Sequence, residues 1–223
     1  AALGGLPAIL SMAGAPEVPD LVVECAGHGG LREHGVSVLE RGCPLLTASI
    51  GALADDALHT ALRDAAQAAG SRLHLATGAI GALDAIGAAR VGTLKSVTYT
   101  GRKPPRGWVG SRAGEVLELE AMTGPAQAHF DGTARDAALL YPKNANVAAA
   151  VALAGLGFDA TRVQLIADPG ATANIHEIHA EGDFGSLRFE IAGNTLPGNP
   201  RTSALAAMSM VKEIAAMSAP VGF

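Results

Sequence analysis

The sequence predicts an α/β protein in which a partial Rossmann-type parallel sheet is followed by an α+β region with a mostly antiparallel sheet. Up to residue 90, short apolar strands alternate with helices, and the short connections specify parallel strands with right-handed crossovers. After residue 90, longer segments alternate between apolar and polar residues, as antiparallel strands with one covered face do. We therefore expect two regions, 1–90 and 91–223.

Three strand–helix units fill the first region. The expected strands are the apolar segments 21–26, 44–49 and 72–76. The first of them, LVVECA, is apolar on both faces, which predicts a buried position. The expected helices cover 27–42, 57–70 and 77–90, the second with Asp55 or Asp56 as its cap. Glycines follow two of the strands, at positions 27, 29 and 30 and at 78 and 81, so we expect a ligand crevice at the carboxyl edge of this sheet.

The second region begins with an alternating segment, TLKSVTYTGRK (93–103), which predicts a long strand. Further strands are expected over 163–168, 174–182 and 186–193, the last two joined by a hairpin turn at GDFG (182–185). A strand is also expected over 115–122, where so short a run allows a helix as the alternative. Residues 135–157 predict a helix that breaks at Pro142 and resumes with Asn144 as its cap. The closing helix, 202–218, has Thr202 or Ser203 in the cap position.

Composition excludes several classes of protein. The 223 residues are 49% apolar with a formal net charge of −5, so the chain can bury a core but lacks the basic excess that binds nucleic acid. The sequence contains no run of about 18 apolar residues, which is the length that a membrane-spanning helix needs. Cys25 and Cys43 are too few for a disulfide scaffold or a zinc site, so we expect no bound metal and two buried thiols. A cytoplasmic protein is expected. The opening residues carry no signal-peptide pattern and lead abruptly into an apolar strand, so we expect an N-terminal piece to be missing.

Polar residues that could carry chemistry gather at two expected helix starts. Lys143, Asn144 and Asn146 follow a proline, where an ammonium, amide groups and a helix dipole converge. This arrangement suits a carboxylate or amide ligand, and an ordinary helix cap with a solvated lysine is the equal alternative. Arg201, Thr202 and Ser203 precede the closing helix and offer a second anion-binding terminus.

Two of the seven histidines lie together in the expected strand NIHEIHAEG (174–182). His176 and His179 point to opposite faces of that strand, so they do not share a metal ion. His176 lies with Asn174 and Ile178, and we expect it to be enclosed and to act as a general acid or base. His179 lies with Glu177 on the more polar face, where we expect it to be solvated. The other five are interpreted as surface or turn residues: His28, His34, His59, His74 and His129.

Five segments together resemble the L-aspartate dehydrogenase family. They are DLVVECAGH (20–28), ATGAIGALDAI (76–86), YPKNANVAAAVALAG (141–155), ADPGATANIHEIHAEGDFG (167–185) and GNTLPGNPRTSALAA (193–207). The resemblance implies that 1–90 is the C-terminal part of a Rossmann-type dinucleotide-binding domain and that 91–223 is a catalytic and dimerisation domain. It also implies a homodimer that uses NAD or NADP to interconvert L-aspartate with oxaloacetate and ammonia through iminoaspartate, a reaction linked to NAD biosynthesis.

The resemblance also implies roles for individual residues. His176 matches the catalytic histidine of the family, and Ala79 and Asn146 match its contacts with the nicotinamide cofactor. The candidates for holding substrate carboxylates are Lys143, Asn199, Thr202 and Ser203, with Pro200 and Arg201 in the same turn.

The opening strand of that family and its G-x-G-x-x-G fingerprint do not occur in these residues. We therefore expect the chain to bind NAD(P)H more weakly than a form that carries the fingerprint. The choice between NAD and NADP stays open for the same reason, since no residue here can be assigned to the ribose 2′ position. Two other functions remain open. One is a related two-domain dehydrogenase for another amino or hydroxy acid, such as a homoserine dehydrogenase-like protein, and the other is a non-catalytic dimeric remnant without cofactor binding.

Overall fold

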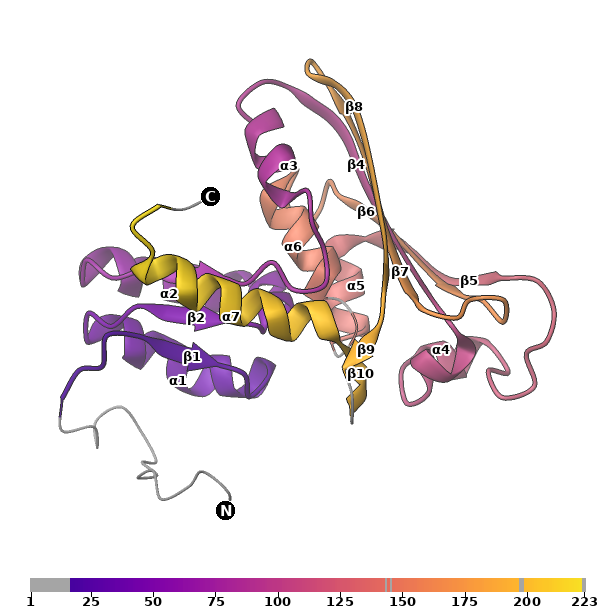
Figure 1. Cartoon of the computed structure of the whole chain (residues 1–223), viewed down its shortest axis with the longest axis horizontal. Helices are drawn as coiled ribbons and strands as arrows, with labels where there is room; N and C mark the ends of the chain where they lie inside the picture. The colour runs from indigo at the N-terminus through magenta and orange to yellow at the C-terminus, as the bar shows by residue number, and fades with distance from the viewer. Residues whose placement is uncertain (1–16, 143, 145, 197–198, 222–223) are drawn as a thin grey trace.

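The computed structural model describes residues 17–142, 144, 146–196 and 199–221, with the backbone alone at 199–201 (Figure 1). Its first part is a three-stranded sheet in the order β1 (Val22–Glu24), β2 (Leu45–Thr47), β3 (Leu73–Leu75). Both strand pairs are parallel, which confirms the expected strand–helix alternation. Helices α1 (His28–Glu40) and α2 (Asp56–Ala68) connect the strands, and a 3-10 helix, η2 (Ile50–Ala54), precedes α2.

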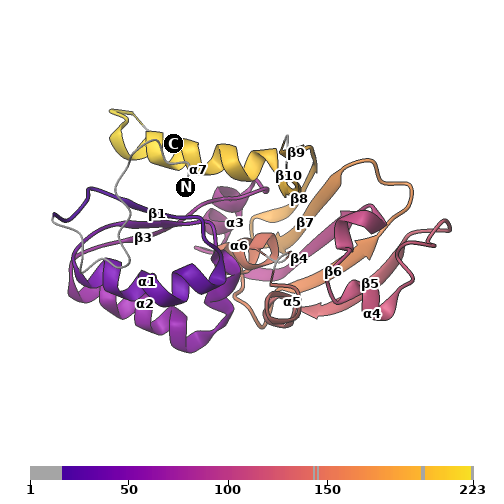
Figure 2. The ribbon, with the colours of Figure 1, turned by 90° about the horizontal axis from the view of Figure 1, so that it is seen from below.

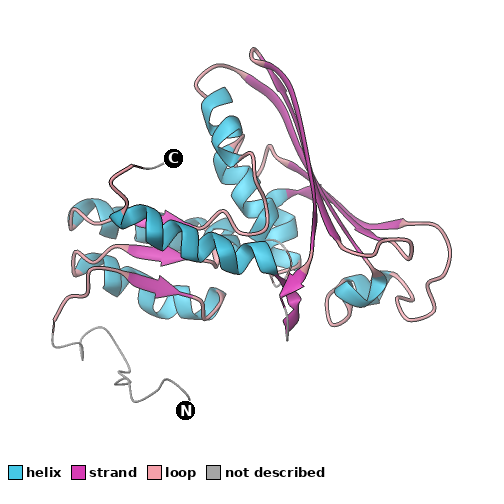
Figure 3. Ribbon diagram, viewed as in Figure 1, coloured by secondary structure: helices cyan, strands magenta, loops and turns pink. Residues whose placement is uncertain are grey.

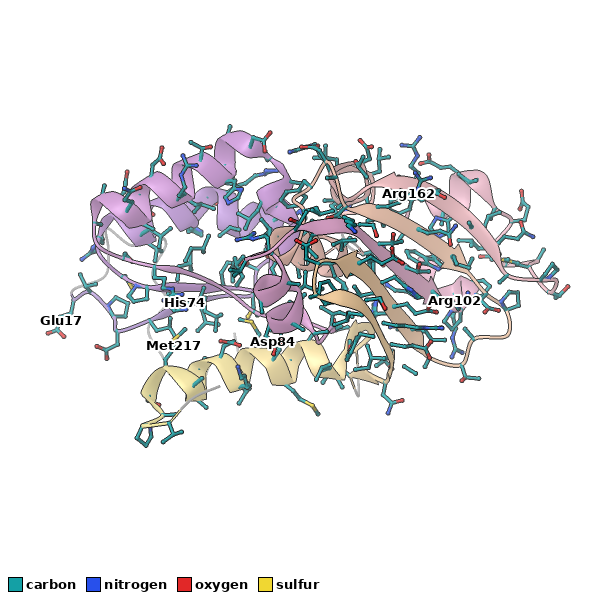
Figure 4. The ribbon with its side chains drawn as sticks, turned by 90° about the horizontal axis from the view of Figure 1, so that it is seen from above. Glu17, His74, Asp84, Arg102, Arg162 and Met217 are labelled. Carbon is teal, nitrogen blue, oxygen red and sulfur yellow. The ribbon has the colours of Figure 1, made fainter. Side chains whose placement is uncertain are left out.

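The last helix of the chain returns to this first sheet. Helices α1 and α2 lie on one face of the sheet and α7 (Ala204–Ser218) lies on the other (Figure 2). Met210 packs with Leu46 of β2 and with Ala76, and the Ser209 hydroxyl accepts a hydrogen bond of 3.0 Å from the backbone N–H of Gly78. Helix α7 lies along this face of the first sheet, as the positions of His74 on β3 and Met217 on α7 show (Figure 4). A segment from the far end of the chain therefore covers the second face of the first sheet.

The second sheet has five strands in the order β5-β6-β4-β7-β8. Their bounds are β4 (Leu94–Lys103), β5 (Gln127–Thr133), β6 (Arg162–Ala167), β7 (Asn174–Gly182) and β8 (Gly185–Gly193). Only the β4–β6 pair is parallel, so the expected mostly antiparallel sheet is confirmed. Helices α3 (Leu83–Ala89), α5 (Ala134–Leu140) and α6 (Asn146–Ala154) cover the face directed toward the first sheet (Figure 3). Between this sheet and its helices lies much of the main core.

Arg135, on α5, ties the two parts of the chain together. Its guanidinium donates hydrogen bonds to the backbone carbonyl of Ala54 and, at 3.0 Å, to Asp56 at the start of α2. On its other side it donates two hydrogen bonds to Asp159, at 2.6 and 2.8 Å. The paired geometry suits a planar guanidinium and lowers the pKa of the Asp159 carboxyl. The described part of the chain includes no helix that is long and apolar enough to cross a membrane.

The expectation of a strand over 115–122 is wrong. The short helix α4 (Ala113–Val116) ends within this segment and turns follow it, so the segment lies outside the sheet although its residues alternate, and the alternative of a helix holds only for its first two residues. The place beside β6 is taken by β5, whose sequence QAHFDGT has too few apolar residues to be recognised as a strand. Helix α4 follows the 3-10 helix η3 (Pro105–Trp108). The short pair β9 (Thr195–Leu196) and β10 (Asn199–Ser203) precedes α7 and was also not expected.

Three smaller differences concern the edges of elements. The third helix begins at Leu83 rather than at 77, because Gly78 and Ala82 have the positive φ angles of 70° and 61° that interrupt a helix. Helix α6 begins at Asn146, and the Asn144 side chain accepts a hydrogen bond from Lys103 instead of capping the helix. Strand β1 is an outer strand of the described sheet, and Val23 is 40% exposed rather than buried.

Candidate functional site

A cavity of about 400 Å³ lies at the carboxyl edge of the first sheet, where the crevice was expected. Segments that follow each strand line it, including Gly27 after β1, Ser49 after β2 and Gly78 after β3. The second sheet contributes Lys103, at the end of β4, and His176, on β7. Residues at the starts of α6 and α7 complete the lining: Asn144, Asn146, Val147, Thr202, Ser203, Ala206, Ala207 and Met210. The cavity therefore joins the two sheets.

A buried carboxylate braces this edge of the first sheet. Glu24 Oε1 accepts hydrogen bonds from the backbone N–H groups of Ala26, at 2.6 Å, and Gly27, at 2.8 Å. Its Oε2 accepts one from the Thr47 hydroxyl at 2.5 Å, which links the ends of β1 and β2. Gly27 has a φ of 88°, a conformation that favours glycine, and α1 begins directly after it. Hydrogen bonds to the Glu24 side chain thus hold the turn after β1, and Gly27 of this turn lines the cavity.

Asn146 is fixed by contacts from two distant segments. Its Oδ1 accepts a hydrogen bond of 2.9 Å from the backbone N–H of Gly51 and lies 3.2 Å from His28 Nε2. Because Oδ1 is engaged, the Nδ2 group is the one that can donate to a ligand. Ala79, on the loop after β3, lines the same cavity and is buried. The residues present fit a nicotinamide cofactor, since an amide donor, small side chains and exposed backbone suit a flat ring that carries a carboxamide.

His176 is enclosed, as predicted. It is 4% exposed, and its Nδ1 lies 2.7 Å from the Tyr99 hydroxyl. Burial, with a smaller contribution from the positive charge of Lys103, lowers the pKa of His176 to about 4. The imidazole is therefore neutral at physiological pH. His179 lies on the opposite face, where its side chain is 52% exposed and 3.7 Å from Glu177, so the predicted assignment of faces is confirmed.

Lys103 is a charged cavity residue that sequence reasoning missed. It is 9% exposed, donates a hydrogen bond of 3.0 Å to Asn144 Oδ1, and places Nζ 4.8 Å from the centre of the Trp108 ring. Burial lowers the pKa of Lys103 to about 8, so the ammonium keeps its charge at neutral pH. Its position in β4 gave a signal, because Lys103 shares the inward face of the strand with Val97 and Tyr99.

The start of α7 brings two predicted residues to the cavity, Thr202 and Ser203. Ser203 is buried, and its hydroxyl has no hydrogen-bond partner among the residues that the structure describes. It occupies the N-cap position of a 15-residue helix without capping it. Lys143 lies outside the described residues, as do the side chains of Asn199 and Arg201, so their predicted roles stay predictions.

Two expectations about other residues are corrected. Cys25 is exposed and lines the cavity, because it follows β1 at the open edge of the sheet, whereas Cys43 is buried as expected. His129 is a core residue rather than a surface residue. It packs edge-on against Trp108, with ring centres 4.4 Å apart, and its Nδ1 lies 3.1 Å from the Tyr141 hydroxyl. The weak apolar pattern of β5 gave no indication that position 129 faces inward.

Two family profiles match most of the chain. The profile described as "Aspartate dehydrogenase, C-terminal" matches residues 84–217. The profile described as "Homoserine dehydrogenase, NAD binding domain" matches residues 2–76. The two matches together cover both sheets and most of the segments that line the cavity, with a gap at 77–83 that includes Gly78 and Ala79.

Several curated proteins are similar over most of their length. An L-aspartate dehydrogenase of Ruegeria pomeroyi is 63% identical over 93% of this chain and 75% of its own length. Proteins of the same name from Cupriavidus taiwanensis and Pseudomonas aeruginosa are 53% and 50% identical over 88% and 93% of this chain, and over 73% and 78% of their own lengths. Among solved structures, the aspartate dehydrogenase of Thermotoga maritima is similar in fold, with a TM-score of 0.78 over 99% of this chain and 86% of that one at 24% identity.

Proposed function

The chain belongs to the aspartate dehydrogenase family, and we propose that its cavity oxidises L-aspartate to oxaloacetate and ammonia with NAD or NADP, and catalyses the reverse amination. One observation carries the proposal. A buried neutral imidazole, His176, and a buried ammonium, Lys103, line one cavity at the carboxyl edge of a Rossmann-type sheet. The first can exchange a proton or a hydrogen bond with a reacting oxygen, and the second can hold a carboxylate.

A substrate with two carboxylates fits the charges of the cavity. Lys103 supplies a full positive charge from β4. The N-terminus of α7, with Thr202 and the unpartnered Ser203 hydroxyl, supplies backbone and side-chain donors from another wall. Lys143 and Asn199 remain proposed carboxylate contacts on the family resemblance. Together these groups favour a dicarboxylate such as aspartate over an amino acid with a neutral side chain.

The chemistry follows from this placement. Asn146 and Ala79 would hold the nicotinamide ring, which would supply the hydride acceptor. The Cα–H bond of L-aspartate breaks with its electron pair and iminoaspartate forms. Water then adds to the imine carbon, the C–N bond breaks, and ammonia and oxaloacetate leave. His176 assists at the oxygen atom of the water that adds to the imine carbon during oxidation. In the reverse amination, the same oxygen atom leaves oxaloacetate as water. Lys103 and the start of α7 hold the two carboxylates throughout.

Matched histidine variants test this function. NAD(P)H formation should be fastest with L-aspartate and much slower with L-homoserine, L-malate or L-glutamate. His176→Ala should lower kcat about 100-fold or more, the usual contribution of a positioned acid or base. His179→Ala, on the same strand but on the solvated face, should change little. Both variants should keep the affinity for NADH, measured by fluorescence titration. Equal loss of activity in the two variants, or preference for another substrate, would contradict the proposal.

The proposal includes a homodimer formed through the C-terminal half and a cytoplasmic location. Exposed apolar side chains on α7 support the dimer, namely Met208, Val211 and Ile214. The segment 115–122 gives no further support, since it does not form the strand expected there. Both cysteines are free, which agrees with a reducing compartment.

A further inference from the structure

Tyr99 and His176 come together through a glycine. In the register of β4 and β7, Gly101 lies opposite His176, and Tyr99 lies opposite Ile178. A Cβ atom placed on Gly101 would be only 2.7 Å from the Tyr99 hydroxyl oxygen, so the tyrosine side chain occupies the space above Gly101. From that position its hydroxyl reaches across to Nδ1 of His176 at 2.7 Å. The missing side chain at position 101 therefore permits the contact.

The direction of this hydrogen bond follows from burial. Tyr99 is 1% exposed, and burial raises its pKa, so the phenol keeps its proton. A buried hydroxyl needs an acceptor for that proton. Within the described part of the chain, His176 Nδ1 is the hydrogen-bond partner of the Tyr99 hydroxyl. The phenol donates, so Nδ1 carries a lone pair and the proton of the neutral imidazole resides on Nε2.

We propose that Tyr99 is a positioning residue that fixes His176 as the Nε2–H tautomer, so that the imidazole offers a hydrogen-bond donor to the substrate. The proposal rests on the proposed function and assigns one of the two ways in which His176 could assist. A neutral N–H group can polarise the carbonyl oxygen of oxaloacetate as ammonia adds, and it can stabilise the negative charge that develops there. In the oxidation direction the same N–H group donates to the oxygen of the water that adds to the imine carbon. The two protons of this water pass to the imine nitrogen, which leaves as ammonia when the C–N bond breaks, so His176 does not act as the base that removes them.

The tautomer is measured directly by nitrogen NMR on protein with 15N-labelled histidine, with a His176→Asn variant to identify the signals. At pH 7.5, Nδ1 should appear unprotonated and Nε2 protonated. Tyr99→Phe removes only the hydroxyl and should give a mixture of both tautomers. The variant should lower kcat about 10-fold and change the KM for L-aspartate less than about twofold. The pKa of His176 should rise above about 4, because the neutral imidazole loses its donor, and it should stay below the ordinary value, because burial and Lys103 still oppose protonation.

The chain contains a matched control for each substitution. Tyr141 forms the same kind of buried contact, 3.1 Å from Nδ1 of His129, away from the cavity. Tyr141→Phe should therefore leave kcat and the His176 signals unchanged. Gly101→Ala should reproduce Tyr99→Phe by displacing the phenol. Gly132→Ala crowds Phe130 in the same way, with the new Cβ 2.8 Å from Phe130 Cζ, and should reproduce neither effect.

Two results would overturn the proposal. One is a wild-type His176 with its proton on Nδ1, and the other is a Tyr99→Phe variant with unchanged signals and kcat. The NMR measurement needs no substrate. An inactive wild type that shows the Nε2-protonated signal would thus contradict the proposed function and leave the tautomer assignment standing.

Discussion

Replacing Lys103 by methionine should make the protein more stable while it weakens substrate binding. Burial lowers the pKa of Lys103 from 10.5 to about 8, so the folded chain binds this proton less tightly than the unfolded chain does. At neutral pH, below both values, this difference costs folding about 3 kcal/mol. The cost is fully present below about pH 8 and disappears as the pH rises to 10.5.

The methionine variant also gives up two contacts of Nζ, and their loss offsets part of that gain. The hydrogen bond to Asn144, at 3.0 Å, and the position above the Trp108 ring, 4.8 Å from its centre, each contribute about 1 kcal/mol. Methionine has a similar length and fills the same volume without a charge. The net gain is therefore about 1 kcal/mol at pH 7, which raises Tm by about 2–4 °C in a chain of this size. Near pH 10.5, where the cost of the charge is gone, the variant should be no more stable than the wild type.

The same substitution should raise the KM for L-aspartate about 10- to 100-fold at pH 7, since a hydrogen bond to a charged group contributes about 1.5–3 kcal/mol. In the wild type, KM should rise above about pH 8 as Lys103 loses its proton, and in the variant it should not depend on pH there. Thermal unfolding at pH 7 and 10.5 and steady-state kinetics measure both effects. Lys95→Met, on an exposed position of β4, is the control and should change neither. A lower Tm at pH 7 with an unchanged KM would refute the reasoning, because the ammonium would then be a structural contact only.

Three further predictions concern the cofactor, the sheet edge and assembly. Asn146→Asp keeps the acceptor for the Gly51 N–H but replaces the Nδ2 donor, so the Kd for NADH should rise about tenfold in a fluorescence titration. An unchanged Kd would remove Asn146 from the cofactor site. Glu24→Gln leaves one of three donors around the carboxylate without its acceptor and should lower the free energy of unfolding by about 2 kcal/mol in urea, whereas exposed Glu33→Gln should have little effect. Light scattering at micromolar concentration should give the mass of a dimer, and a monomeric mass would contradict the proposed assembly.

Local periodicity predicted the parts of the site that lie within one strand. The alternation of β7 places His176 on the inner face and His179 on the outer face before any pairing is known. The same argument applied to β4 would have placed Lys103 inward, beside Tyr99. A lysine at the end of a strand is usually solvated, however, so the residue type favoured an exposed Lys103 although its position in the alternation faces inward. The glycines after β1 and β3 predicted the open edge of the sheet correctly.

The rest of the site depends on contacts between distant segments. Asn146 meets Gly51 and His28 across 95 and 118 positions of the chain, and α7 returns to the first sheet from the far end of the sequence. No local pattern encodes such contacts. Strand β5 was missed because its polar residues hide the alternation, and 115–122 was misassigned because alternation alone does not show whether a sheet edge is available.

The two ionisable groups of the cavity affect each other, and the proposed substrate changes their balance. With the cavity free of ligand, burial, the charge of Lys103 and the donated hydrogen bond from Tyr99 all favour a neutral His176. A carboxylate bound at Lys103 cancels much of that charge, which raises the pKa of Lys103 and removes one of the three effects on the imidazole. The Tyr99 hydrogen bond does not depend on the substrate, so the neutral tautomer persists when the site is filled. Lys103 therefore serves to bind the carboxylate, and Tyr99 maintains the state of His176 during the reaction.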